Sequence, residues 1–391
     1  MSRARAGYEG VAVAVPVTVP YTTHSEHSVH WWIAKALQML CNDAGITKDQ
    51  IDGLSLASFT LAPDGPVAVA QHLGLELRWI DGIALGGASS VVGLRHAARA
   101  VQSGDANIIA CIGADINRPG AFRDLVTSFS RFSQDAAYPY GAAGPNGSFA
   151  LLTDHYMRTY GARAEDFGKL AVSQRENASA NPIALLRKPM SLQDYLDSRP
   201  IADPIRLLDC VMPCAGAEAY LVMHEDTAKE LGLPYAQLAS AIERHNAFSQ
   251  DPIQFRGGWQ VDSEELWGMA GMEHSDIDVV QTYDDYPVIS MMQFEDLGFC
   301  AKGEGPQFVR EHTFTTDGSF PHNTSGGQLS TGQAGAAGGH LGTVEALRQV
   351  LGRSLGNQVA DAQTALVSGF GMINYDRGLC SAAAILTQGA H

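Results

Sequence analysis

A helix-and-strand pattern that occurs twice constrains the fold of this chain most. In the first half, GGASSVVGLRHAARAVQSG is followed by NIIACIGAD, and in the second half, GAAGGHLGTVEALRQVLG is followed by TALVSGFGM. Each copy has small residues at a helix start, one amphipathic helix, and a buried strand that ends at glycine. The pattern predicts two similar α/β halves packed face to face.

Apolar residues alternate between strand-like and helix-like spacing along the rest of the chain. The predicted strands are Val11–Val19, Ile51–Phe59, Ile83–Leu85, Ile108–Ile112, Ala239–Arg244, Val279–Thr282, Thr364–Ser368 and Ala382–Thr387. The predicted helices are His27–Ala44, Val67–Leu73, the segment from Ser89 to Gly104, and Gly338–Val350. Strands that alternate with helices predict an α/β fold, in which active-site residues lie on the loops at the strand ends.

Residues 117–204 break this alternation. They are rich in aromatic, serine and proline residues, and they are too numerous for a simple loop. We expect an irregular inserted subdomain here. The chain then divides into a first half at 1–236, which contains the insertion, and a second half at 237–391.

Charge and cysteine usage exclude several classes of partner and site. The 391 residues include 26 Lys and Arg against 42 Asp and Glu, a net charge of −16, which argues against binding nucleic acid or an anionic membrane surface. No apolar run approaches the ~20 residues that span a bilayer. The six cysteines are scattered without a CxxC pair, unlike a disulfide scaffold or a zinc site. We expect a cytoplasmic protein with reduced thiols and no cysteine-bound metal.

Four motifs resemble a known family. They are GGASSVVGLRHAARAVQSGDA, TYDDYPVISMMQFEDLGFC, NTSGGQLSTGQAGAAGG and VSGFGM, and LDCVMPCAGAEAYLVM closes the first half in a similar way. Together they resemble the thiolase superfamily in its sterol-carrier and lipid-transfer branch, over essentially the whole chain. The resemblance implies the thiolase fold, with two duplicated α/β halves in five layers (αβαβα) and an inserted loop subdomain.

The chain departs from the thiolase pattern at the residues that carry thiol chemistry. Alignment anchored on Gln102-Ser103-Gly104 places Gly87 at the position of the nucleophilic cysteine. Gln333 replaces the histidine that activates this cysteine, and Ser368 replaces the second cysteine, which moves the proton at the α-carbon. A thiolase mechanism through an acyl-cysteine is therefore not expected.

Tyr283 stands where the branch has its motif histidine. In this respect the chain resembles the thiolase-like aldolases that shorten steroid side chains. The resemblance implies retro-aldol cleavage of a β-hydroxyacyl-CoA to a ketone or aldehyde and a shorter acyl-CoA, with the CoA ester as substrate and no cofactor. Those aldolases carry a second tyrosine where this chain has Gln333, so the catalytic detail does not transfer whole.

A retro-aldol step needs a base for the β-hydroxyl, donors for the thioester enolate, and an acid for its α-carbon. We expect Tyr283 to transfer one proton and Gln333 to donate a hydrogen bond, because an amide does not titrate. Asp285, His322 and His340 are the candidate bases. The candidate oxyanion and substrate-binding residues are Gly87, Ser89, Ser90, His322, Asn323, Ser368 and Gly369.

Structural roles for the same residues stay open. Tyr283 could end a strand with its hydroxyl bonded to backbone. Asp284 and Asp285 are typical caps for a helix that begins near Pro287, and Ser89 and Ser90 are typical of an N-cap. His340, in the first turn of a predicted helix, also fits a neutral core histidine.

Two other functions and two partners stay open as well. The chain could be an acyl-CoA C-acyltransferase, for which Ser89 is the only plausible nucleophile, or an inactive subunit that binds acyl-CoA. The resemblance further implies a homodimer, and a small zinc-ribbon/OB-fold partner that completes a heterotetramer. The sequence does not identify the acyl group or the physiological direction, since cleavage and condensation share one transition state.

Overall fold

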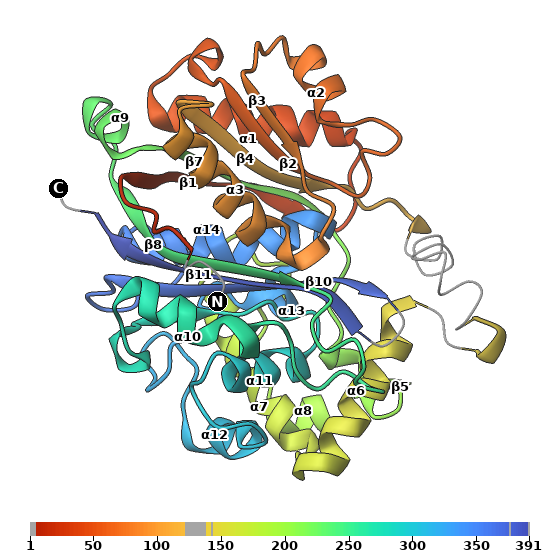
Figure 1. The fold of residues 1–391 in the computed structure, drawn as a ribbon. Coiled ribbons are helices and arrows are strands. Elements are labelled where there is room, and N and C mark those ends of the chain that lie inside the picture. Colours follow the sequence, from red (N-terminus) through yellow and green to blue (C-terminus); the bar gives the residue numbers. More distant parts are fainter. Residues whose placement is uncertain (1–4, 122–137, 142–143, 375–376, 390–391) are drawn as a thin grey trace.

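Figure 1 shows the chain as a computed structural model, which describes residues 5–121, 138–141, 144–374 and 377–389. Within these ranges, nine strands form one mixed sheet in the order β3-β2-β4-β7-β1-β8-β11-β10-β9. Their bounds, in that order, are Trp79–Gly82, Gly53–Ala57, Ile108–Asp115, Ala215–His224, Val11–Thr22, Tyr235–His245, Arg377–Gln388, Thr364–Asn374 and Val279–Gln281. A separate small sheet pairs β5 (Pro200–Ala202) with β6 (Ile205–Arg206).

The strand order of the large sheet is mirrored about the pair β1 and β8. Outward from β1 come β7, β4, β2 and β3, and outward from β8 come β11, β10 and β9. On each side, the first strand of a half therefore pairs with its last strand. In the second half, His322 bridges to Val280 of β9, as β3 pairs with β2 in the first half. This mirrored order agrees with the duplication that the repeated sequence pattern predicts.

Two helices fill the layer between the halves of the sheet. α3 (Ser89–Ser103) and α14 (Gly338–Val350) contact each other, and their apolar residues share one cluster with Val11 and Val13 of β1. Successive side chains of a strand point to opposite faces. Ala12, between these two valines, accordingly packs in the cluster of the outer face.

The two outer faces are covered by further helices (Figure 1). α1 (Val29–Ala44) packs on the first half, and α10 (Trp259–Ala270) and α11 (Pro287–Asp296) pack on the second. The result is five alternating layers of helix and sheet. The other α-helices outside the insertion are α2 (Pro66–Leu73), α9 (Glu225–Glu230), α12 (Gly305–Glu311) and α13 (Gly327–Thr331). Short 3-10 helices are η1 (Lys48–Gln50), η2 (Gly86–Ala88), η3 (Tyr138–Tyr140), η4 (Leu207–Asp209), η5 (His274–Asp276) and η6 (Gly335–Ala337).

The inserted segment is helical rather than irregular in its described part, so that prediction is wrong there. It contains α6 (Gly144–Tyr160), α7 (Ala164–Ser179) and the short α8 (Leu192–Leu196), while 122–137 and 142–143 lie outside the described residues. Phe149, Leu152 and Tyr156 are buried at helical spacing on one face of α6. The many polar residues around them obscured this periodicity in the sequence.

Two strand predictions also need correction. The strand expected at Ile83–Leu85 lies at Trp79–Gly82, where it forms the edge of the sheet with alternating partly buried and exposed residues. The strand expected to end at Ser368 continues to Asn374 through two glycines. A Cβ atom at Gly369 would lie 2.7 Å from the carbonyl oxygen of Gly87, so glycine permits close packing here rather than ending the strand.

We propose a border between the two halves of the chain that follows the strands. β8 begins at Tyr235, so a border just before this strand, rather than at 236/237, keeps the first strand of the second half whole. No helix within the described ranges is long and apolar enough to cross a membrane.

Candidate active site

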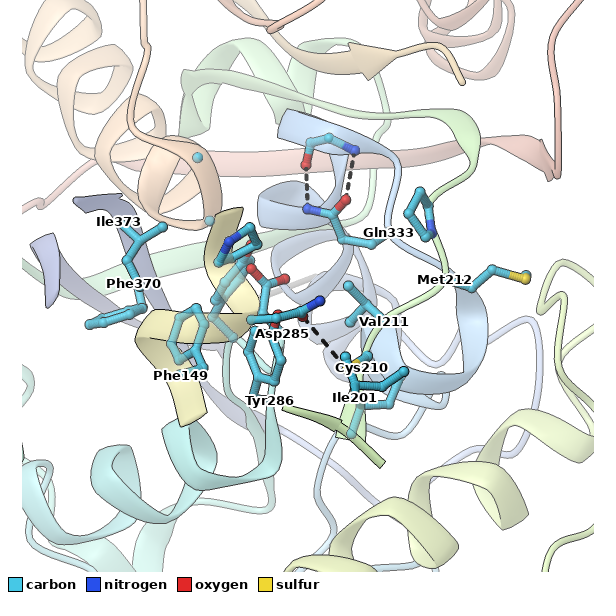
Figure 2. Close-up of a pocket in the computed structure, with 18 of the residues that line it drawn as sticks. Phe149, Ile201, Cys210, Val211, Met212, Asp285, Tyr286, Gln333, Phe370 and Ile373 are labelled. Carbon is cyan, nitrogen blue, oxygen red and sulfur yellow. Dashed lines mark hydrogen bonds between the residues drawn. The ribbon is translucent and has the colours of Figure 1, made fainter. Parts of the chain in front are cut away.

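A cavity of about 650 Å³ lies where the inserted segment meets the two halves (Figure 2). Its wall is mostly apolar, and Figure 2 shows Phe149, Phe370 and Ile373 on one side of it, with Ile201, Val211 and Met212 on the other. These apolar residues include Phe149, Ile201, Leu208, Val211, Met212 and Phe370. Four of the residues singled out in the sequence line it, namely Gly87, Tyr283, Asp285 and Gln333. An apolar cavity with a few polar groups at one place is typical of a small-molecule site.

Tyr283 occupies the space in which a side chain at position 87 would lie. Tyr283 follows β9 by two residues and is 8% exposed. A Cβ atom built on Gly87 would overlap ring carbons Cε2 and Cζ of Tyr283. Gly87 and Tyr283 therefore depend on each other. Because position 87 carries no side chain, the ring of Tyr283, from the second half of the chain, can occupy that space.

Gly87→Ala is expected to lower the turnover number by about 10²-fold, because a displacement of about 1 Å at a reacting group has this effect. The added methyl group must push the Tyr283 ring out of its place. Steady-state kinetics together with thermal unfolding check this. The matched control is Gly268→Ala in α10, where a Cβ atom meets nothing within 4 Å. We expect this control to keep full activity and to gain about 0.5–1 kcal/mol of stability; full activity in Gly87→Ala would contradict the placement of Tyr283.

Asp285 lies beside Tyr283, and the two groups shift each other's pKa. Burial raises the pKa of Asp285 to about 7, and hydrogen bonding with the Tyr283 hydroxyl opposes part of this rise. Burial and the Asp285 carboxyl together raise the pKa of Tyr283 well above its usual value. Tyr283 is thus held as a neutral phenol, suited to donate a proton, while Asp285 exchanges a proton near neutral pH.

Asp284 has a structural role, although at a different helix from the predicted one. Its carboxylate accepts hydrogen bonds from the backbone N–H groups of Gln328 and Leu329, in the first turn of α13, at 3.0 and 3.4 Å. Burial raises its pKa to about 6. Neither Asp284 nor Asp285 caps α11, because the N-cap position there is Tyr286, which has no side-chain bond to that helix.

The structure places the two candidate histidines away from the cavity. His322 is fully buried, with Nε2 2.8 Å from the Thr282 hydroxyl, and burial lowers its pKa to about 3. His340 is also buried, with Nδ1 3.2 Å from the carbonyl oxygen of Ala336, and burial lowers its pKa to about 4. Neither lines the cavity. Of the three candidate bases, only Asp285 meets it.

The candidate serines are also turned into the protein. Ser89 accepts a hydrogen bond from the backbone of Leu85, and Ser90 donates one to Thr343 at 2.8 Å. Ser368 donates to Gln293 at 2.6 Å. None of the three lines the cavity.

Asn323 and Gly369 support the backbone around the site. The Asn323 side-chain oxygen accepts from the backbone N–H of Thr282, just before Tyr283, at 2.9 Å. Gly369 packs against the backbone of Gly87 and Ala88. Asn323 thus fixes the backbone next to Tyr283 and Gly369 packs against Gly87, while neither lines the cavity itself.

Gln333 lines the cavity, but its amide is engaged with its own chain. It donates to the Gly335 carbonyl at 3.3 Å and accepts from the Gly335 N–H at 3.2 Å, as Figure 2 shows. Gln333 also lies near enough to the Tyr283 hydroxyl to lower the pKa of that group slightly. It thus contributes a hydrogen bond beside Tyr283 and no titratable group.

Sequence reasoning missed three polar residues of the cavity, Asn146, Arg175 and Arg199, which all come from the insertion. The Asn146 side-chain oxygen accepts from the Tyr286 hydroxyl at 2.5 Å and from Cys210 Sγ at 3.7 Å. With its oxygen so engaged, the amide NH₂ group of Asn146 is left to donate. The sequence Pro-Asn-Gly around Asn146 reads as a turn, which gave no signal of this role.

No group of three or more His, Cys, Asp or Glu residues is placed to hold a metal ion in the part of the chain that the structure describes.

Comparison with known proteins decides the family. A family model described as thiolase C-terminal domain-like matches residues 240–385. A steroid side-chain-cleaving aldolase of Thermomonospora curvata is 32% identical over 85% of this chain and 89% of its own length. The chain belongs to the thiolase-like aldolases. A 17-hydroxy-3-oxo-4-pregnene-20-carboxyl-CoA lyase of Mycobacterium tuberculosis is 31% identical to this aldolase chain, over 86% of it and 89% of the lyase.

Solved structures confirm the thiolase fold predicted for this thiolase-like aldolase. An Ltp2-ChsH2(DUF35) aldolase matches with a TM-score of 0.84 and 29% identity, over 97% of this chain and 98% of the other. A monomeric SCP2-thiolase-like protein of Mycobacterium smegmatis matches in fold, with a TM-score of 0.73 and 16% identity, over 98% of this chain and 78% of the other.

Proposed function

We propose that this thiolase-like aldolase cleaves a β-hydroxyacyl-CoA by a retro-aldol step, giving a ketone or aldehyde and a shortened acyl-CoA. The observation that carries the proposal is the placement of Tyr283. Its ring fills the space of a side chain at Gly87, and a buried carboxyl with a pKa near neutrality lies beside it. The pair can move protons, whereas the position of a cysteine nucleophile is taken.

In the first half of the reaction, the Asp285 carboxylate removes the proton of the β-hydroxyl. The Cα–Cβ bond then breaks, the carbonyl forms at Cβ, and the bonding electrons enter the thioester as an enolate. In the second half, the Tyr283 hydroxyl gives its proton to the α-carbon. Asp285 returns its proton to Tyr283, so the proton of the β-hydroxyl ends on the α-carbon and both residues regain their starting states.

The enolate oxygen needs donors while the negative charge develops. Gly86 and Gly87 line the cavity at the N-terminal end of α3, where backbone N–H groups and the helix dipole favour an anionic oxygen. The Asn146 amide is a further donor, oriented by Tyr286 and Cys210. We assign the thioester oxygen to this set of donors.

We propose a steroid or another branched apolar side chain as the acyl group. The relatives are a steroid side-chain-cleaving aldolase and a pregnene-carboxyl-CoA lyase. The cavity of about 650 Å³ with a mainly apolar wall suits such a group. The CoA thioester is the substrate, and the mechanism calls on no cofactor.

The substrate panel that tests this function pairs each β-hydroxyacyl-CoA with its β-ketoacyl-CoA, from short to steroid-like acyl groups. Mass spectrometry reads the products with and without free CoA. We expect cleavage of β-hydroxyacyl-CoA alone, independent of free CoA. Cleavage of only the β-keto esters, and only with free CoA, would instead establish thiolysis.

The acyltransferase alternative has less support from the geometry, because the Ser89 hydroxyl is buried against Leu85 and Ile83 and does not reach the cavity. The same substrate panel distinguishes an aldolase from an inactive binding subunit, because an inactive subunit would bind acyl-CoA and cleave none of the substrates.

We further propose that the chain works in an assembly in the cytoplasm. The solved Ltp2-ChsH2(DUF35) aldolase supports a small DUF35 partner, which we expect to be the zinc-ribbon/OB-fold protein of a heterotetramer. The edge strand β3, with Ile80 38% exposed, offers a surface for a homodimer. Size-exclusion chromatography with light scattering tests both assemblies.

A further inference from the structure

Arg175 is a buried cation in the wall of the cavity. It lies on α7 and is 9% exposed. Its Nε donates to the Ser330 hydroxyl at 3.0 Å, and its Nη1 lies 3.5 Å from the Lys188 carbonyl oxygen. Both acceptors are neutral. Among the described residues, no carboxylate forms an ion pair with Arg175.

A buried charge without a counter-charge is unfavourable, and proteins almost always pair such groups. Burial lowers the pKa of Arg175, and no acidic neighbour among the described residues opposes this. Arginine nevertheless keeps its charge, because its intrinsic pKa is so high. Among the described residues, the site therefore offers no negative charge that would balance the guanidinium.

Arg348 provides the contrast, because it is similarly buried but lies away from the cavity. Its positive charge opposes the rise in the pKa of both Glu218 and Glu345, which places two carboxyl groups near it. In the part of the chain that the structure describes, the buried arginine outside the cavity thus has acidic neighbours, and Arg175 has none.

We propose that Arg175 binds an anionic oxygen group of the substrate. This proposal rests on the proposed function and deepens it, because it adds a requirement for a negatively charged group on the substrate. The group is either a phosphate of CoA or a carboxylate carried by the acyl part. Both offer the paired oxygens that the planar guanidinium recognises.

Binding measurements without turnover test the proposal. Isothermal titration calorimetry compares CoA with pantetheine, which lacks the phosphates, and succinyl-CoA with butyryl-CoA, which lacks the terminal carboxylate. None of these probes has a β-hydroxyl group, so the result does not depend on retro-aldol activity. The variants are Arg175→Met, which removes the charge at similar length, and Arg175→Lys, which keeps the charge and loses the paired geometry. The control Arg353→Met removes an exposed arginine that does not line the cavity.

We expect Arg175→Met to weaken binding of the anionic probe by about 10- to 100-fold, Arg175→Lys to weaken it less, and Arg353→Met to leave it unchanged. If a phosphate is bound, CoA binding falls and pantetheine binding does not. If a carboxylate is bound, only the preference for succinyl-CoA over butyryl-CoA disappears. Unchanged binding of all probes by a folded Arg175→Met protein would overturn the proposal. The proposal would also be overturned if the wild-type protein bound CoA no more tightly than pantetheine and succinyl-CoA no more tightly than butyryl-CoA. The same holds if it bound none of the four probes at millimolar concentration.

Thermal unfolding shows whether Arg175→Met folds. If it does not, the proposal is tested by comparing how the wild-type protein and Arg175→Lys bind the four probes. Loss of the succinyl or phosphate preference in the lysine variant supports the proposal. Retention of the full preference there contradicts the paired contact with the guanidinium.

Discussion

Tyr283→Phe is expected to lower the turnover number for β-hydroxyacyl-CoA cleavage by about 10²- to 10⁴-fold, the range for loss of a proton-transfer group. Phenylalanine keeps the ring that fills the space beside Gly87, so the cavity and the fold should persist. Only the proton that the α-carbon receives is lost. Single-turnover kinetics with quantified acyl-CoA product measure this directly.

The matched control for this change is Tyr8→Phe. Tyr8 is also buried, and its hydroxyl donates to the Ala241 carbonyl oxygen at 3.2 Å, outside the cavity. We expect this variant to lose about 1 kcal/mol of stability and no activity. Equal activity losses in the two variants would mean that Tyr283 acts through stability, and full activity in Tyr283→Phe would remove it from the mechanism.

Asp285→Asn is expected to abolish the base and to lower the turnover number by a similar factor, about 10²- to 10⁴-fold. In the wild-type protein, kcat/KM should rise with pH through about 7, because Asp285 must lose its proton to act as a base. The variant should lose this dependence. A pH profile of kcat/KM from pH 5 to 9 tests both statements.

The same substitution should stabilise the fold at pH 8. Asp285 has a pKa of about 7 in the folded chain against an ordinary value of 3.8, so the folded state binds more protons between these values. Its contribution to stability is therefore present below about pH 4 and lost as the pH rises to 7. Removing the buried negative charge should add up to about 4 kcal/mol at pH 8. Denaturant unfolding at pH 5 and pH 8 measures the difference.

Asp296→Asn is the control for both effects. Asp296 is buried with a pKa raised to about 6, but it is held by Lys302 at 2.9 Å and does not line the cavity. We expect this variant to lose stability, because it weakens a buried ion pair, and to keep the wild-type pH profile. An Asp285→Asn variant that keeps activity, or a pH profile that changes equally in both variants, would exclude Asp285 as the base.

The fold was predictable because its signals are local. The spacing of apolar residues within each segment predicts the repeated helix and strand. The small residues at the start of α3 and α14 likewise indicate close packing there. The insertion was not predictable in the same way, since α6 and α7 bury narrow faces among polar residues. Glycine was ambiguous, because Gly369 permits close packing inside β10 rather than ending it.

The part of the site that could be predicted from the sequence is the part where two motif positions depend on each other. Gly87 and Tyr283 each stood at a motif position, and the structure shows that they share one space. The choice among Asp285, His322 and His340 required three dimensions, because burial and orientation separate them rather than residue type. Asn146 and Arg175 lie in the insertion without a motif, so only the folded cavity reveals them.

The most direct test of the central claim is intact-protein mass spectrometry during turnover of a β-hydroxyacyl-CoA in the absence of free CoA, with the released products measured in parallel. The account predicts a ketone or aldehyde and a shortened acyl-CoA in equal amounts, and a chain whose mass does not change. An acyl adduct that forms and decays on the chain at the rate of turnover, or products that appear only when free CoA is added, would contradict it.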